Sequence, residues 1–314
     1  MISHAVIDRA AVNCVAWRWP WIGGTEGVVR KPAGPRGNFV TDSPVERPQP
    51  GAADKRPYLL EVCVDRLGDA IAAVDAGADR LELCGCLEVG GLTPSAGLLR
   101  EVLDATDAQV VAMIRPRAGG VCYDDHDLQV AQREATEALA AGATGIVFGA
   151  LRSDGVIDRD ATGRMVQAAG PAEFVFHRAF DFAPDASAAL ETLVDLGVTR
   201  LLTSGGKPTA PQGVARLQAL CEQARGRIQI MPGSGVRPEN ILRLVHATGC
   251  RQIHVGASLA RTDNSLDLFP DIPMRSAAAY DNGAYRAVDA AAVRHAAEIL
   301  RTAGVDSHPA PRTP

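Results

Sequence analysis

Residues 58 to 304 alternate between short apolar runs and longer amphipathic stretches, and the alternation repeats eight times. This pattern is typical of parallel strands joined by helices. Eight such units over about 250 residues fit a single (β/α)8 TIM barrel. A doubly wound sheet stays the alternative, because it uses the same alternation with one reversal of strand order. The predicted strands span residues 58–64, 80–84, 109–115, 145–149, 173–178, 200–203, 227–232 and 251–255, and the predicted helices 67–76, 95–105, 125–141, 158–169, 185–196, 211–225, 238–248 and 289–303.

The first two predicted strands carry the same pattern, Glu61-Val-Cys63 and Glu82-Leu-Cys84. Alternate residues of a strand project from one face, so each glutamate and its cysteine point to the same side. Carboxylates that face a core are rare unless they are paired, whereas a buried cysteine often packs as a small hydrophobic residue. The glutamates are therefore the stronger sign of a site, and the cysteines fit either interpretation.

The composition is that of an ordinary globular protein, with 46% hydrophobic and 22% charged residues in a chain of 314. A formal net charge of -5 disfavours nucleic acid as a partner. No run approaches the roughly 18 apolar residues that span a membrane, so we expect no membrane partner. Seven cysteines, an odd number without a signal peptide, predict reduced thiols and a cytoplasmic location.

The segment 1–57 differs from the rest because it is rich in proline and has no periodicity. We interpret it as a disordered extension, or as the product of a wrongly chosen translation start. The barrel is predicted to occupy residues 58–260 and 284–304. An irregular loop is expected at 261–283 and a flexible tail at 305–314.

Polar residues gather where the predicted strands end, which is where a (β/α)8 barrel carries its chemistry. Arginines and glycine-rich loops suit an anionic ligand, because guanidinium and backbone N–H groups bind anions. We expect Glu61 to pair with Arg115, which leaves Arg178 and the loop amides for the ligand. The predicted substrate-binding residues are Arg115, Arg178, Ser204, Gly205, Gly233 and Gly235.

Two side chains at these strand ends could move a proton, Glu61 and His177. His254 lies inside a strand, and we interpret it as structural. The arginines could instead pair with Glu61 and Glu82 as structural ion pairs, while the glycines only permit tight turns. Schiff-base chemistry is disfavoured, because Lys207 lies in a loop beyond the sixth strand rather than at a strand end.

A series of ordered motifs in this region resembles the CutC family, which is associated with copper homeostasis. The resemblance covers about residues 58–260, extends more weakly to the last helix and does not include the first 57 residues. It implies a cytoplasmic TIM barrel, sometimes oligomeric, with a Cu(I) site proposed at Cys63 and Cys84, and it brings no settled enzymatic activity. The motifs are Leu60-Glu-Val-Cys-Val-Asp65, Gly77-Ala-Asp-Arg-Leu-Glu-Leu-Cys84, Gly90-Gly-Leu-Thr-Pro-Ser95, Met113-Ile-Arg-Pro-Arg117, Phe148-Gly-Ala150, Phe176-His-Arg-Ala-Phe-Asp181, Leu202-Thr-Ser-Gly205 and Met231-Pro-Gly233.

Two departures from the family pattern affect the expected site. Gly120 stands where the family usually has an aspartate, so a carboxylate is missing from that loop. Cys86 stands where the family more often has a small residue, and it adds a third thiol near Cys63 and Cys84. The resemblance implies Cys63 and Cys84 as the metal ligands, and Cys86 is a further candidate because soft thiolates suit Cu(I).

Two functions therefore remain open, beside an inert or partner-binding scaffold. The first is a copper-handling protein that holds Cu(I) through its cysteines. The second is an enzyme of unassigned reaction that acts on a small phosphorylated or carboxylated metabolite. The expected partners are a copper ion or such an anion and, from the resemblance, a second copy of the chain.

Overall fold

The computed structural model describes residues 58–269, 272 and 283–305. The disordered extension predicted at 1–57 and most of the tail predicted at 305–314 lie outside the described residues, as does most of 270–282. Val305 itself still belongs to the last helix.

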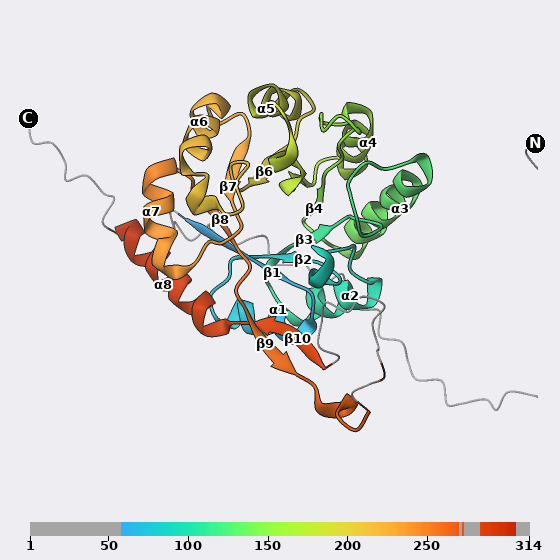
Figure 1. The fold of residues 1–314 in the computed structure, drawn as a ribbon, viewed down its shortest axis with the longest axis vertical. Coiled ribbons are helices and arrows are strands. Elements are labelled where there is room, and N and C mark those ends of the chain that lie inside the picture. The colour runs from blue at the N-terminus through green and yellow to red at the C-terminus, as the bar shows by residue number, and fades with distance from the viewer. Residues whose placement is uncertain (1–57, 270–271, 273–282, 306–314) are drawn as a thin grey trace, which may run out of the picture. The chain divides into compact units, whose positions relative to one another are not determined.

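Eight parallel strands form one sheet in the order β7-β6-β5-β4-β3-β2-β1-β8 (Figure 1). Consecutive strands are neighbours, and β1 pairs with both β2 and β8. This order has no reversal, so it confirms the TIM barrel and excludes the doubly wound alternative. The strands are β1 (Leu59–Val64), β2 (Arg80–Leu83), β3 (Gln109–Met113), β4 (Gly145–Phe148), β5 (Glu173–Phe176), β6 (Arg200–Thr203), β7 (Gln229–Pro232) and β8 (Gln252–Val255).

Helices follow the strands and surround the sheet (Figure 1). Their starts obey local rules, since Ser95, Asp124, Asp158 and Asp185 each accept a hydrogen bond from a backbone N–H group of the first turn. All eight predicted helices form, with small shifts at their ends. They are α1 (Leu67–Asp75), α2 (Ala96–Ala105), α3 (Asp125–Ala141), α4 (Arg159–Ala169), α5 (Ala186–Asp195), α6 (Val214–Ala224), α7 (Pro238–Thr248) and α8 (Ala290–Val305).

The strands bury both of their faces. Residues such as Leu81, Ile146 and Phe174 pack between the sheet and the helices. The alternate residues fill the barrel interior, where Val111, Val147, Val175, Leu202 and Met231 form a second cluster together with Met113 and Cys84. Polar side chains of the interior therefore sit against an apolar layer, which makes each of them costly unless it finds a partner.

An antiparallel hairpin follows β8, and the sequence prediction of an irregular loop at 261–283 missed it. Its strands are β9 (Ser258–Thr262) and β10 (Ala284–Val288). Residues 284–288, which we assigned to the barrel, belong to this hairpin instead. Four of the five β9 residues are exposed, so the segment lacks the apolar run that marked the barrel strands. Among the described residues no helix is long and apolar enough to cross a membrane.

Candidate functional site

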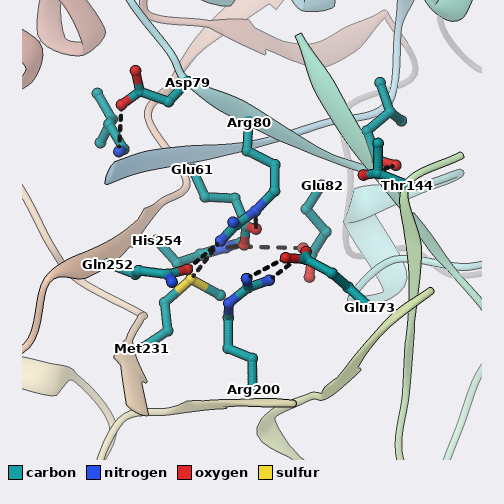
Figure 2. A network of polar contacts seen from close by, with 12 residues as sticks. Glu61, Asp79, Arg80, Glu82, Thr144, Glu173, Arg200, Met231, Gln252 and His254 are labelled. Carbon is teal, nitrogen blue, oxygen red and sulfur yellow. Dashed lines mark hydrogen bonds and ion pairs between the residues drawn. The ribbon is translucent and has the colours of Figure 1, made fainter. Parts of the chain in front are cut away.

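A chain of polar contacts crosses the barrel interior at the starts of the strands (Figure 2). Arg80 on β2 bonds to Glu61 at 2.5 Å and to Gln252 at 2.8 Å. On the opposite wall, Arg200 holds Glu173 through two bonds of 3.0 Å and Gln229 through one of 3.1 Å. The Gln252 amide donates to Gln229 at 2.6 Å and joins the two halves. We call Glu61, Arg80, Glu173, Arg200, Gln229 and Gln252 the basal network.

Glu61 pairs with Arg80, not with Arg115, so our prediction of its partner was wrong. The register explains the choice, because Glu61 lies directly opposite Arg80 on β2 and His254 on β8. The Nδ1 atom of His254 lies 2.8 Å from Glu61 Oε1. Burial alone would raise the pKa of Glu61, but His254 and Arg80 outweigh it and lower the pKa to about 2. Glu61 is thus a fully buried, paired carboxylate.

Glu82 lies two residues after Arg80 and is much less well satisfied. Its Oε2 atom accepts from the Cys84 thiol at 3.8 Å and lies 3.8 Å from His254 Nε2. Its Oε1 atom is buried and has no hydrogen-bond partner among the described residues. Burial, and secondarily the charge of Glu61, raises the pKa of Glu82 despite the nearby His254. An unsatisfied buried carboxyl oxygen is costly and calls for a functional explanation.

His254 lies between the two glutamates, and Figure 2 shows its ring joined to both. Burial would lower its pKa, but Glu82, Cys63 and Glu61 together raise it well above the usual value. We had interpreted His254 as structural, yet it lines the main cavity. The available signal was the alternation along β8, since His254 projects to the same side as Gln252 two residues earlier.

The thiols of Cys63 and Cys84 lie side by side, with 3.8 Å between their sulfur atoms. We call them the thiol pair. The repeated Glu-x-Cys pattern produces this contact, because Cys63 lies opposite Glu82 and Cys84 follows the end of β2. Cys63 also groups with Glu82 and His254, whose donor atoms all lie within 4.8 Å of one another. Cys86 is exposed and lines neither of the cavities that Cys63 lines.

A cavity of about 700 Å³ opens above these groups at the carboxyl ends of the strands. Cys63, Glu82 and His254 lie within β1, β2 and β8 and therefore line its deep end. Arg115, His177 and Arg178 line it further out, as do apolar residues from several loops. Of the predicted site residues, this cavity brings together Cys63, Arg115, His177 and Arg178. Glu61 is not among its lining residues, because Arg80 and His254 enclose it.

Arg115 is held by carbonyl groups. It donates to the carbonyl oxygens of Val89 and Gly91 at 2.9 Å each and of Gly119 at 2.7 Å. None of the ion pairs between described residues includes Arg115. Only 8% of its surface is exposed, so it is a buried cation whose charge no carboxylate offsets.

The loop after β6 already binds an anion, the carboxylate of Asp181 from the 3-10 turn after β5. The backbone N–H groups of Ser204 and Gly206 donate to it at 3.0 and 2.9 Å. The Ser204 hydroxyl also donates to it at 2.8 Å, and Arg178 Nε does so at 2.9 Å. The Gly205 N–H group donates to Thr203 Oγ1 at 3.0 Å. These donors of Ser204 and Gly205 are occupied within the protein, and neither residue lines the main cavity.

The remaining glycines have packing roles. A Cβ atom on Gly233 would lie 2.5 Å from Leu202 and 3.3 Å from His254. Gly235 has a φ of +65° and approaches Thr209 closely, and it lines a different cavity at the start of α7. The His177 ring packs directly against Gly149, which the sequence analysis did not single out. A Cβ atom at position 149 would lie 2.5 Å from two atoms of the ring.

Comparison with known proteins gives a consistent result. The model of the CutC family matches residues 58–259. The Homo sapiens protein named copper homeostasis protein cutC homolog is 43% identical over 204 residues, which are 65% of this chain and 75% of the relative. A CutC family protein of Agrobacterium fabrum is 40% identical over 244 residues, 78% of this chain and 94% of its own. The crystal structure of a CutC protein from Streptococcus agalactiae aligns with a TM-score of 0.60 at 35% identity and covers 63% of this chain and 97% of that one.

Proposed function

The chain belongs to the CutC family, and on that premise we propose that it takes part in copper homeostasis by binding Cu(I) between the thiols of Cys63 and Cys84. The observation that carries the proposal is the 3.8 Å separation of the two sulfur atoms. Thiolates are soft ligands and select Cu(I) over harder cations. Cys63 lines the 700 Å³ cavity, which supplies a path for the ion.

The neighbouring groups favour a site made by the thiol pair rather than by Cys63, Glu82 and His254. The pKa of His254 is raised well above its usual value, so a metal ion at its ring would have to displace a proton, as it would at either thiol. The softness of the ligands therefore decides between the two sites. Glu82 offers a hard oxygen ligand, which suits Cu(I) less well than sulfur does. Its unpartnered Oε1 atom places negative charge beside the cation when the carboxyl group ionises.

Both thiols are protonated when no metal is bound. Contact with Cys84, followed by burial, raises the pKa of Cys63 well above its usual value. Contact with Cys63 lowers the pKa of Cys84, but burial and Glu82 outweigh it and raise the pKa. Copper must therefore displace protons, and the apparent affinity should rise with pH. The proposal also places the protein in the cytoplasm, where reducing conditions keep thiols free.

The test is a Cu(I) titration of the full chain in competition with a coloured Cu(I) chelator, under reducing conditions and at two pH values. The variant Cys63→Ser with Cys84→Ser should lose one bound Cu(I), and the wild-type affinity should be higher at the higher pH. A matched control is Cys221→Ser with Cys250→Ser. It removes the other close pair of described thiols, 3.3 Å apart and at the opposite ends of the strands.

The control should retain the copper ion that the first variant loses. Equal Cu(I) binding by the wild type and the Cys63/Cys84 variant would remove the thiol pair from this role. Cys86→Ser should behave as wild type, because Cys86 is exposed and lines neither cavity that Cys63 lines.

A further inference from the structure

The outer wall of the main cavity carries a positive charge that is paired with no carboxylate of the described residues. Arg115 is buried, and its three hydrogen bonds go to neutral carbonyl oxygens. Carbonyl dipoles solvate a cation but do not cancel its charge, and a buried charge without a pair is costly. Copper binding at the thiols does not account for the buried Arg115, because a bound Cu(I) ion and the guanidinium group are both positive and repel each other.

Two further groups converge on the same wall. The Nδ1 atom of His177 accepts from the Ala179 N–H group at 3.1 Å, so the ring proton lies on Nε2. Burial above all, and then the charges of Arg115 and Arg178, lowers the pKa of His177 to about 4. The imidazole is therefore a neutral N–H donor in the positive field of both arginines. Arg178 uses Nε and Nη2 for Asp181 and Ser204, while its side chain stays 41% exposed at the cavity.

The rest of the wall is apolar. Met113, Val121, Leu151 and Leu202 line the cavity, and Phe182 stands at it with 75% of its surface exposed. A mostly apolar cavity of several hundred Å³ with a few convergent polar groups is the usual form of a small-molecule site. An exposed phenylalanine beside such a cavity offers a surface for an apolar ligand.

We infer that this cavity binds a small organic oxyanion, a carboxylate or a phosphate ester on an apolar body, through Arg115, His177 and Arg178. The anionic group lies against the three polar side chains, where guanidinium groups match the geometry of oxyanions. The apolar body lies against Met113, Leu202 and Phe182. The inference goes beyond the copper proposal and does not depend on it, because Cys63 lies at the deep end of the cavity and Cys84 is not among the lining residues.

The experiment measures the binding of four probes to the metal-free full chain by calorimetry and thermal shift. Benzoate and phenyl phosphate carry the oxyanion on an apolar ring, inorganic phosphate lacks the ring, and benzamide keeps the shape of benzoate without its charge. Benzoate or phenyl phosphate should bind and raise the melting temperature. Benzamide should bind at least about tenfold more weakly, the loss expected for one charge-assisted hydrogen bond. Inorganic phosphate should also bind at least about tenfold more weakly, because it lacks the apolar ring. The tighter of the two charged probes identifies the carboxylate or the phosphate class.

The main variant is Arg178→Gln, because this side chain is partly exposed and its replacement leaves no buried cavity. Arg115 is buried, so Arg115→Gln would also test folding and is not used. Arg178→Gln should weaken the charged probe roughly tenfold. Gly149→Ala should also weaken it, because the added Cβ displaces the His177 ring. Arg164→Gln is the charge-matched control on α4, where Arg164 lies 3.5 Å from Asp125 at the surface, and it should leave binding unchanged.

The copper and anion proposals fail separately. The Cys63→Ser with Cys84→Ser variant should bind the charged probe as wild type does, and Arg178→Gln should keep its Cu(I). Benzamide binding as tightly as benzoate, an Arg178→Gln variant that matches the wild type, or no response to any probe would each overturn the anion site.

Discussion

Polar side chains at the two ends of the barrel interior differ in how completely they are paired. At the starts of the strands, the basal network joins two glutamates, two arginines and two glutamines in one continuous chain of contacts. At the ends of the strands, within the part of the chain that the structure describes, Glu82 Oε1 has no hydrogen-bond partner, the two thiols contact only weak partners and Arg115 pairs with no carboxylate. Glu61, Arg80 and Arg200 are buried at one end, as Glu82 and Arg115 are at the other, so burial alone does not explain the difference between these charged groups.

From this difference we infer that the basal network stabilises the fold and that the polar groups at the ends of the strands bind a ligand. A buried charge contributes to a stable structure only when hydrogen bonds and an opposite charge offset its desolvation. The basal network meets this condition. The other end does not, and strained or unsatisfied groups of this kind cluster at functional sites. The comparison predicts that substitutions at the basal end change stability, while those at the other end change binding.

The largest expected effect comes from breaking the basal network. Arg80→Met leaves Glu61 buried next to His254 alone, and it should lower the free energy of unfolding by about 3–5 kcal/mol, as the loss of one partner from a buried pair does. Urea unfolding followed by circular dichroism measures the change. The double variant Arg80→Met with Glu61→Gln should recover part of the loss, because no lone charge remains.

The matched surface variant is Arg227→Met, which breaks the exposed pair with Glu191. It should leave the unfolding midpoint unchanged, because exposed ion pairs contribute little. If Arg80→Met were equally harmless, the basal network would not be the stabilising region.

A smaller effect is expected from pH. The pKa of Glu61 is about 2 in the folded protein against a usual 4.5, so its contribution is fully present above about pH 4.5 and is lost as the pH falls toward 2. The pKa of His254 is raised, so its contribution is fully present below about pH 6.5 and is lost as the pH rises through the higher folded value.

Unfolding free energies of the metal-free protein should therefore fall on acidification below pH 4.5 by up to about 3 kcal/mol from Glu61. The Glu61→Gln variant should lack this part of the decline. An identical acid profile for the variant would show that other carboxyl groups dominate.

The smallest effect sharpens the comparison at two neighbouring positions. Glu61 and Glu82 are both buried and differ in their partners, so the same substitution tests each region. Glu61→Gln should cost about 1–3 kcal/mol of unfolding free energy, because it removes charge-assisted bonds to Arg80 and His254. Glu82→Gln should cost less, because one carboxyl oxygen has no bond to lose. A larger cost at Glu82 would reverse the assignment of the two regions.

The fold was predictable because every barrel strand is buried on both faces and reads as an apolar run, while four helices begin at a serine or aspartate that caps them. The repeat of Glu-x-Cys on two adjacent strands drew attention to Cys63 and Cys84, but their contact could not be predicted, because the two copies are offset by two residues and Cys63 lies opposite Glu82. Hydrogen bonds from side chains to the backbone of loops could not be predicted. Arg115 binds carbonyls of three different loop residues, and no side-chain pattern records where a carbonyl oxygen points.

Two other features escaped prediction for a similar reason. Asp181 occupies the amides of the loop after β6, and its reach depends on the short 3-10 turn Arg178–Phe182, which has no strong sequence signal. His254 was undervalued because a histidine inside a strand is usually structural. Its role depends on its position opposite Glu61. The register between two strands cannot be predicted from the sequence of either strand alone.

The sheet begins at β7 and ends at β8, and no strand ladder joins these two among the described residues. Strand β8 thus pairs with β1 alone, and it carries both Gln252 of the basal network and His254 of the cavity. Amide hydrogens of β7 and β8 at this edge have fewer hydrogen-bond partners in a neighbouring strand, so we expect them to exchange with solvent before those of β2 to β5. A ligand that touches His254 would slow that exchange, and so link occupancy of the cavity to the closure of the barrel.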